Sequence, residues 1–144
     1  MSHVRIWVHI VFSTKNREPL LKDSFRYDVF KHIAENCLAK NIFLQAINGH
    51  TDHIHCLISL GKDQNIAKIV QLIKGESSFW INQQRLTPTK FAWQDEYFAV
   101  SVSESQLDQV MNYIKNQEKH HAKKPFTQEV DEFIKHYGWQ ATDI

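Results

Sequence analysis

The sequence predicts an α+β domain with the ferredoxin-like split βαβ arrangement, and three observations support that fold class. The 144 residues are the size of one ordinary domain, so we treat residues 1–144 as a single domain with one core. Apolar residues recur with the period of a strand in some segments and the period of a helix in others. The order of these segments is strand, helix, strand, strand, helix, strand, which matches a four-stranded antiparallel sheet with two helices on one face.

The first strand and the first helix are predicted near the N-terminus. Apolar residues alternate over residues 3–13, which is typical of a strand that is covered on at least one face. A helix then extends to about Lys40, with apolar residues at every fourth position. Asp23 or Ser24 can cap its first turn, because a short polar side chain accepts a hydrogen bond from a backbone N–H there.

A hairpin, a second helix and a fourth strand follow. Residues 42–47 and 52–60 are predicted as paired strands, and the Asn48–Gly49 pair between them is a strong turn signal. Asn65 can cap the second helix, and residues 96–103 are predicted as the fourth strand. If the two helices cover one face of the sheet, the other face is left for a ligand, a partner or further helices.

Two more helices are predicted after the fourth strand. Ser103 and Gln106 have the spacing of a capping box for a helix that extends to about His121. Thr127 can cap a last short helix, which Gly138 ends. The predicted fold is therefore the ferredoxin-like unit with two helices added at its C-terminus.

The composition excludes several classes of protein. Apolar residues make up 42% and charged residues 23%, which is typical of a folded globular protein. No apolar run approaches the ~18 residues that a membrane-spanning helix needs, and the first residues lack the features of a signal peptide. We therefore expect a cytoplasmic protein whose cysteines, Cys37 and Cys56, are buried thiols rather than a disulfide.

The charge of the chain is nearly balanced. A net charge of +1 predicts no strong overall attraction to nucleic acid, so any DNA contact must come from local basic clusters. Lys15 and Arg17 follow the first strand, and Lys115, Lys119 and Lys123 belong to a second basic stretch. The simpler interpretation of such clusters is a solvated surface.

His53 and His55 occupy alternate positions of the predicted third strand, so their side chains project from the same face. Two neutral imidazoles at this spacing can bind one metal ion, and imidazole suits Mn, Zn, Fe, Ni or Cu better than Ca. The pattern alone is a weak signal, and two histidines that simply face solvent are the alternative. Cys56 points to the opposite face, which disfavours a structural zinc site. We also expect Asp52 to face away from the pair, with at most an indirect role.

Tyr113 and Gln117 lie four residues apart on the predicted helix, so they share one face beside its apolar stripe. A tyrosine at an interface with its hydroxyl in water is the common explanation for such a residue. The histidine pair favours a second explanation. A glutamine carbonyl can be a further metal ligand, and a phenol, whose pKa is about 10, needs a metal to assist its attack on a phosphate.

Together these motifs resemble those of the single-tyrosine HUH transposases of small bacterial insertion sequences, the IS-two-hundred type TnpA family. The HUH motif, histidine-hydrophobic-histidine, corresponds to residues 53–55, and the Tyr-x-x-x-Gln motif corresponds to residues 113–117. Residues 9–15 and 97–103 are also similar to the family's first strand and to the strand before its tyrosine helix. The chain departs from the family at Thr51, where a proline is common. We expect this change to affect the turn rather than the chemistry.

The resemblance implies a metal-dependent DNA strand transferase that acts as a single-strand endonuclease. His53, His55 and Gln117 would bind Mg or Mn. Tyr113 would attack a phosphate of single-stranded DNA, forming a 5′-phosphotyrosine bond and freeing a 3′-hydroxyl, and rejoining would need no ATP. The family also implies recognition of DNA hairpins near the element ends and a homodimer, whose active sites can be completed in trans.

The resemblance also suggests where the DNA would lie. The candidate phosphate contacts, which would position the strand without reading its sequence, are Lys15, Arg17, Lys74, Lys115, Lys119 and Lys123. Trp80 or Trp93 could stack on an extruded base, although a core or interface position is the simpler interpretation of each.

Three alternatives stay open. A host-adopted relative would use the same chemistry to process chromosomal repeats. A ferredoxin-like nucleic-acid-binding module without catalysis would show no metal dependence. A metal-dependent hydrolase on the same scaffold would use Tyr113 only for binding.

Overall fold

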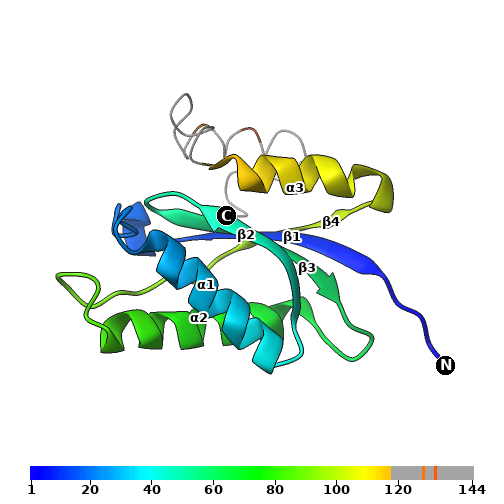
Figure 1. The fold of residues 1–144 in the computed structure, drawn as a ribbon, viewed down its shortest axis with the longest axis horizontal. Coiled ribbons are helices and arrows are strands. Elements are labelled where there is room, and N and C mark those ends of the chain that lie inside the picture. Colours follow the sequence, from blue (N-terminus) through cyan, green and yellow to red (C-terminus); the bar gives the residue numbers. More distant parts are fainter. Residues whose placement is uncertain (118–127, 129–131, 133–144) are drawn as a thin grey trace.

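A four-stranded antiparallel sheet forms the centre of the computed structural model, which describes residues 1–117, 128 and 132 (Figure 1). The strands β1 (Ile6–Ser13), β2 (Phe43–Gly49), β3 (His53–Leu60) and β4 (Phe98–Val102) lie in the order β2-β3-β1-β4. The helices are α1 (Arg26–Ala39), α2 (Ile66–Gln83) and α3 (Leu107–Lys115), with short 3-10 turns η1 (Lys15–Arg17) and η2 (Glu104–Gln106) after β1 and β4. This strand order and the antiparallel pairing confirm the predicted ferredoxin-like arrangement.

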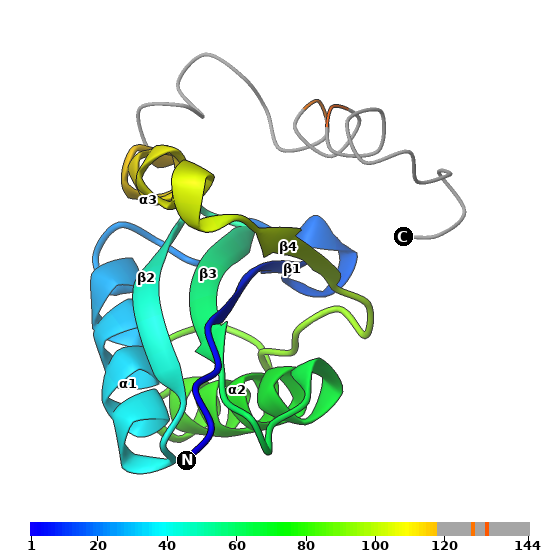
Figure 2. The ribbon, with the colours of Figure 1, turned by 90° about the vertical axis from the view of Figure 1, so that its right-hand side faces the viewer.

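The helices lie on both faces of the sheet. α1 and α2 cover one face, and α3 covers part of the other (Figures 1 and 2). The face that the two predicted helices leave open is therefore partly covered by a further helix, α3. Beyond residue 117, the predicted continuation of this helix to His121 lies outside the described residues, and of the predicted last helix between Thr127 and Gly138 only residues 128 and 132 are described.

The larger core lies between the sheet and the α1–α2 layer. Alternate residues of β1 and β3 point into it, and Ile10, Phe12, Ile54, Cys56 and Ile58 are each at most 2% exposed. Full burial of an isoleucine side chain contributes roughly 1.5–3 kcal/mol. This layer therefore supplies the larger share of the hydrophobic stabilisation.

A smaller apolar cluster attaches α3 to the opposite face. Trp7 of β1, Leu57 of β3 and Ile114 of α3 are buried together, and Val110 and Met111 of α3 pack against them while remaining partly exposed. Because α3 covers only part of this face, polar side chains can lie beside the apolar cluster on the same face of the sheet.

The predicted helix caps are only partly confirmed. Asn65 caps α2, because its side chain accepts a hydrogen bond from the Lys68 amide at 2.8 Å. The predicted cap of α1 by Asp23 or Ser24 is wrong, since the helix begins after Phe25 without a side-chain cap. Asp23 instead accepts a hydrogen bond from Arg26 at 2.6 Å, because the fully buried guanidinium of Arg26 needs a partner for its charge.

The capping box at the start of α3 is also wrong. The chain enters α3 through the 3-10 turn η2, and Ser103 makes no side-chain cap there. Its hydroxyl lies 3.1 Å from that of Ser105 instead. A 3-10 turn places the following amides differently from an α-helical first turn, so the reciprocal bonds of a capping box do not form.

The fourth strand is shorter than predicted, and Lys74 explains why. Its ammonium group donates to the backbone carbonyls of Gln94, Asp95 and Glu96 at 2.6, 3.0 and 3.0 Å. The carbonyl of Glu96 therefore bonds to an ammonium group instead of a strand partner, and β4 begins only at Phe98.

The two cysteines are buried free thiols, as predicted. Burial raises the pKa of Cys37 to about 11, and it raises the pKa of Cys56 as well, so neither thiol is a ready nucleophile. Within the described part of the chain, no helix is both long and apolar enough to cross a membrane.

Candidate active site

The histidine pair lies on the α3 face of the sheet. His53 and His55 stand opposite Ser13 and Val11 of β1, and their side chains share one face, as predicted. Both residues are 0% exposed, so the alternative of two histidines that face solvent is wrong. The alternation of residues in a strand predicts which side chains share a face, but it does not predict what packs on that face.

Gln117 meets His53 just beyond the end of α3. Its Oε1 atom lies 3.1 Å from Nε2 of His53, and its side chain is buried. Its Nε2 atom donates to the Tyr113 carbonyl at 3.3 Å, one helical turn back. That bond holds the NH₂ group of the amide against the helix and directs its oxygen at the histidine.

Asp52 contacts the other ring nitrogen of His53. Its Oδ1 atom lies 2.8 Å from Nδ1 of His53, so the expectation that Asp52 faces away is wrong. Asp52 precedes the first residue of β3, where the alternation of strand faces no longer applies, and its side chain can turn back to its neighbour. A carboxylate at Nδ1 of a histidine orients the ring and increases the basicity of Nε2.

These contacts place an oxygen at each ring nitrogen of His53. A neutral imidazole has one N–H and can donate to only one of these oxygens. When Nδ1–H is donated to Asp52, the Nε2 lone pair faces Oε1 of Gln117 at 3.1 Å, an arrangement that a shared cation can satisfy. A protonated ring satisfies the same contacts without a cation.

The donor set fits a divalent metal that accepts nitrogen and oxygen ligands. Among the described residues, no cluster of three or more His, Cys, Asp or Glu side chains is placed to bind a metal. The fit therefore depends on Gln117 as a ligand of another residue type, in addition to His53 and His55.

His9 belongs to the same polar cluster, although the sequence motifs do not mark it as a site residue. It is 3% exposed on β1, and its Nε2 atom lies 2.8 Å from Nδ1 of His55. This contact occupies Nδ1 of His55 and leaves Nε2 as the ring nitrogen that can bind a cation. His9 shares a face with Trp7 and Val11 in the alternating pattern of β1, which was the available signal.

Tyr113 lies at the edge of this cluster. Its ring is partly buried and approaches the rings of His55 and His9 edge-on, with centroids 5.6 and 6.3 Å apart. The next residue, Ile114, is fully buried against the sheet. The buried isoleucine therefore fixes the rotation of α3 that presents Tyr113 beside the histidines.

Two polar contacts at opposite ends also hold α3 on the sheet. Asn48 of β2 donates to the carbonyl of Lys115 at 2.9 Å, which satisfies a backbone acceptor at the end of the helix. Trp7 of β1 donates through Nε1 to Glu104 at 3.2 Å, next to the helix start. The sequence predicts Asn48 only as a turn residue, which is wrong, since it lies in β2 and pairs with His55.

The candidate DNA-contacting residues are not all in similar positions. Lys15, Arg17 and Lys115 are exposed. All three N–H bonds of the Lys74 ammonium are used on backbone carbonyls, and burial lowers the pKa of this lysine. Lys119 and Lys123 lie outside the described residues. The role of each in DNA binding stays a prediction.

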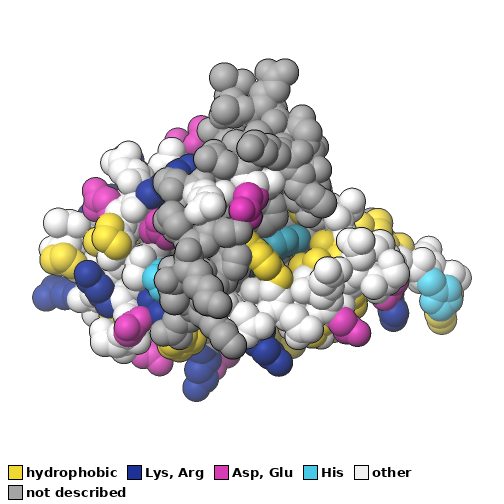
Figure 3. Space-filling view, turned by 90° about the horizontal axis from the view of Figure 1, so that it is seen from above, with side chains coloured by type: hydrophobic (Ala, Val, Ile, Leu, Met, Phe, Trp, Pro, Cys, Tyr) yellow, Lys and Arg dark blue, Asp and Glu magenta, His cyan; other side chains and the backbone are white. Residues whose placement is uncertain are grey.

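The visible charges on the α3 side alternate in sign. Figure 3 shows Lys and Arg side chains separated by Asp and Glu, without a continuous basic stripe on the part of this face that the described residues form. Of the two tryptophans considered for base stacking, Trp93 is buried and donates to Ser77 at 2.9 Å. Trp80 is partly buried and stacks on His32, with centroids 4.2 Å apart.

Comparison with known proteins decides the family. The family model described as "Transposase IS200 like" matches residues 2–117, which include both motifs. The chain belongs to this IS200-like transposase family. Its activity is therefore that of a transposase, which cleaves DNA and transfers strands.

Two solved structures have a similar fold. A protein of Deinococcus radiodurans R1 described as a transposase has a TM-score of 0.63 and 23% identity, over 81% of this chain and 93% of that one. A REP-associated tyrosine transposase bound to a REP hairpin has a TM-score of 0.63 and 15% identity, over 84% of this chain and 72% of that one. At these sequence identities, the similarity of the IS200-like transposase to the two structures extends only to the fold. No curated protein matches the chain.

Proposed function

We propose that this transposase cleaves and rejoins single-stranded DNA at hairpin-bearing element ends, with Tyr113 as the nucleophile. The observation that carries the proposal is the position of Tyr113 beside the buried cluster in which Gln117 Oε1 lies 3.1 Å from Nε2 of His53. A phenol next to two imidazoles and an amide oxygen is suited to attack a phosphate whose charge is compensated locally.

The reaction that we propose conserves the energy of the broken bond. The Oη atom of Tyr113 loses its proton and attacks the phosphorus, while the bond from phosphorus to the 3′-oxygen breaks. The leaving 3′-oxygen takes up a proton and becomes a hydroxyl, and the 5′-phosphate stays on Tyr113. Attack by a second 3′-hydroxyl reverses these steps, so rejoining needs no external energy source.

We propose His53, His55 and Gln117 as the ligands of a divalent metal, Mg or Mn. When bound, such an ion withdraws charge from the phosphate and lowers the barrier to attack by a weak nucleophile. Asp52 and His9 support the proposed ligands, since each lies 2.8 Å from the Nδ1 atom of one histidine. These contacts orient both rings before substrate binds.

Hairpin recognition is proposed by analogy with the REP-associated tyrosine transposase, which is bound to a REP hairpin. Exposed Lys15, Arg17 and Lys115 are the proposed phosphate contacts within the described residues. We also propose a homodimer. Whether the natural target is a mobile element or a chromosomal repeat follows from the DNA that flanks the gene, because hairpin-bearing ends mark an element.

A covalent-adduct experiment tests the proposal. The protein is incubated with Mn²⁺ and end-labelled single strands that contain the hairpin ends, and the products are separated under denaturing conditions. We expect a labelled protein band for the wild type and none for Tyr113→Phe. Tyr27→Phe is the matched control, because Tyr27 is exposed on α1, and it should retain the band. An adduct with Tyr113→Phe would reject the nucleophile assignment.

His53→Ala tests the metal role separately. We expect loss of the adduct with the fold and most hairpin binding retained, as measured by circular dichroism and fluorescence anisotropy. Unchanged cleavage by this variant would remove the metal role. Retained hairpin binding without cleavage by the wild type at any metal concentration would instead favour a non-catalytic binding module.

Mixing Tyr113→Phe with His53→Ala tests whether a dimer exchanges its tyrosine helices. His53 and Gln117 meet within one chain here, so we expect no restored adduct in the mixture. Restored adduct would show that the helix of one subunit completes the site of the other.

A further inference from the structure

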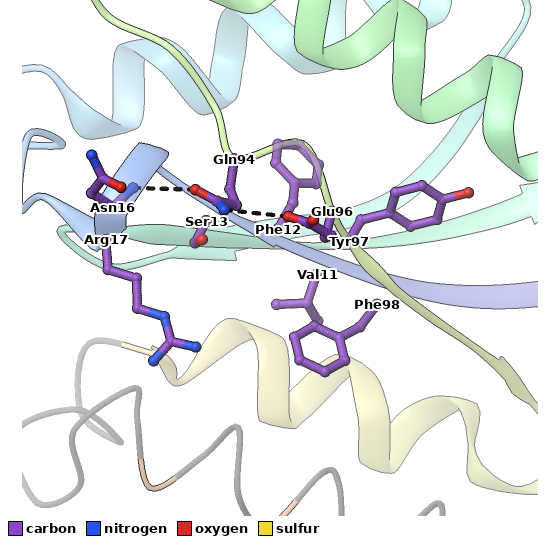
Figure 4. A pocket seen from close by; sticks show the side chains of 9 residues that line it. All are labelled: Val11, Phe12, Ser13, Asn16, Arg17, Gln94, Glu96, Tyr97 and Phe98. Carbon is purple, nitrogen blue, oxygen red and sulfur yellow. Dashed lines mark hydrogen bonds between the residues drawn. The ribbon is translucent and has the colours of Figure 1, made fainter. Parts of the chain in front are cut away.

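A cavity of about 260 Å³ lies beside the candidate active site, between β1 and the segment that leads into β4 (Figure 4). Val11 and Ser13 line it, and in the sheet these residues stand directly opposite His55 and His53. Neighbouring strands are about 4.8 Å apart, so the cavity begins one strand away from the proposed metal ligands. It is separate from the cluster formed by His9, His53, His55 and Gln117.

The side chains around the cavity carry different chemistry on different sides. Val11 and Phe98 form the apolar floor of the cavity, where they are 2% and 8% exposed, and both point from the α3 side of the strands in Figure 4. Gln94 and Glu96 lie together at the β4 side, where Nε2 of Gln94 donates to Oε2 of Glu96 at 3.2 Å. Arg17 supplies a cation at the remaining side, on the turn after β1.

The polar side of the cavity is held by its neighbours. The side-chain Oε1 atom of Gln94 accepts a hydrogen bond from the backbone N–H of Asn16 at 3.2 Å, which directs the NH₂ group of Gln94 at Glu96. The backbone N–H of Gln94 donates to the Ser13 carbonyl at 2.9 Å, and Lys74 binds the carbonyls of residues 94–96. The carboxylate of Glu96 is therefore presented from an ordered segment, which lowers the entropic cost of binding a ligand.

Asn16 and Arg17 have backbone conformations that non-glycine residues rarely adopt. Their φ angles are 59° and 54°, both in the left-handed region. Backbone conformations of this kind persist where surrounding contacts hold them, and they concentrate at binding sites. Here the Arg17 amide donates to the Thr14 carbonyl at 2.9 Å, and this turn places the guanidinium at the cavity.

We propose that this cavity binds one unpaired nucleobase that carries an exocyclic amino group, on the same DNA strand that Tyr113 attacks. Glu96 accepts a hydrogen bond from the amino group, the apolar surface of Val11 and Phe98 packs against the base, and Arg17 contacts the adjacent phosphate. Cytosine, adenine and guanine each have an exocyclic amino group, whereas thymine has none. The inference rests on the proposed function in one respect, namely that the substrate is single-stranded DNA.

Binding of homopolymers to the Tyr113→Phe protein tests this proposal without cleavage. Fluorescent oligo(dC), oligo(dA) and oligo(dT) of equal length are titrated in the presence of a chelator, and affinity is measured by anisotropy. We expect oligo(dC) and oligo(dA) to bind roughly three- to tenfold more tightly than oligo(dT), the size of one good side-chain contact with a base. Equal affinity for the three strands would overturn the proposal.

Glu96→Ala and Asp95→Ala form a matched pair in the same background. Both residues are exposed, adjacent and acidic, but only Glu96 lines the cavity. Loss of a negative charge strengthens DNA binding in both variants, so the base preference is the informative quantity. We expect Glu96→Ala to remove the preference and Asp95→Ala to keep it. The same preference in both variants would reject Glu96 as the residue that reads the base.

Arg17→Gln separates the phosphate contact from base recognition. We expect weaker binding of all three strands by a similar factor, together with a smaller dependence of affinity on salt. A change confined to one homopolymer would contradict the assigned role of Arg17. Adduct formation without a base preference would reject this inference alone, whereas a base preference without any adduct would reject the proposed cleavage alone.

Discussion

Along β3 the two faces of the sheet are equally buried but chemically different. Along β3, Ile54 and Cys56 point into the apolar layer beneath α1 and α2, while His53 and His55 point toward α3, and all four residues are 0% exposed. The first pair is buried with apolar partners. Each histidine is buried with a polar partner, since Gln117 and Asp52 contact His53 and His9 contacts His55.

This difference shows how one short strand combines an apolar face that stabilises the fold with a polar face that carries the proposed metal ligands. Burial of a polar side chain costs free energy unless it is hydrogen-bonded, so the α3 face is stable only because each histidine has a partner. The same partners orient the ring nitrogens, which is what a preorganised metal site requires. We therefore expect substitutions on the two faces to have separable effects.

The largest expected effect is on the apolar face. Ile58→Ala should lower the free energy of unfolding by about 2–5 kcal/mol, because it removes a fully buried side chain and leaves a cavity. Chemical denaturation measures this change, and adduct formation per folded molecule should stay at the wild-type level. Leu38→Ala is the control, because Leu38 is 80% exposed and its loss should matter little. Loss of adduct by a folded Ile58→Ala protein would show that the faces are coupled.

Gly49 packs against the backbone of His53 and Ile54, whose side chains point to opposite faces of the sheet, so its substitution tests both faces at once. A Cβ atom at this position would lie 2.2 Å from the His53 carbonyl oxygen and 2.9 Å from the Ile54 Cα, so backbone must shift. We expect Gly49→Ala to cost about 1–3 kcal/mol of stability and to weaken metal binding as well. Gly75→Ala is the matched control, since nothing lies within 4 Å of the added atom. It should stabilise α2 by roughly 0.5–1 kcal/mol, and a thermal denaturation series compares the two.

Substitution of His9 tests whether the polar face is organised around the proposed metal ligands. His9→Ala removes the partner of Nδ1 of His55, and we expect about 10–100-fold weaker Mn²⁺ binding, as measured by the free-ion signal in electron paramagnetic resonance. His9→Asn keeps a hydrogen-bonding side chain and should restore part of the affinity. His32→Ala, on the opposite side of the sheet, should leave it unchanged. If both alanine variants bind Mn²⁺ normally, His9 has only a packing role.

The smallest expected effect concerns the docking of α3. Asn48→Ala removes the hydrogen bond to the Lys115 carbonyl and should cost about 0.5–1.5 kcal/mol. Because the bond joins β2 to α3, hydrogen exchange should become faster at the α3 amides than in the α1–α2 layer. Gln71→Ala serves as the control, because Gln71 is exposed on α2, on the side of the sheet opposite α3. Equal exchange in both variants would show that apolar contacts alone hold the helix.

Much of the fold was predictable because periodicity is a local property. The alternation of β1 and β3 and the cap at Asn65 follow from backbone geometry over a few residues, and the structure agrees with both. The turn predicted at Asn48–Gly49 is wrong, because both residues still pair with β3 and the chain reverses over residues 50–52. The caps predicted at Asp23 and Ser103 failed for the opposite reason. Buried Arg26 and the 3-10 turn η2 are consequences of packing, which local sequence does not encode.

Periodicity alone shows that His53 and His55 share a face and that Tyr113 and Gln117 lie one helical turn apart. It does not place these two pairs together, and at the level of the sequence only the family resemblance implied that they meet. Only the tertiary structure brings Gln117 to His53, His9 to His55 and the Glu96 cavity beside them, because these residues are separated by 46 to 64 positions or stand on different strands. Distance along the chain carries no information about such contacts. They follow from how α3 and the neighbouring strands pack on β3, which depends on the whole sheet.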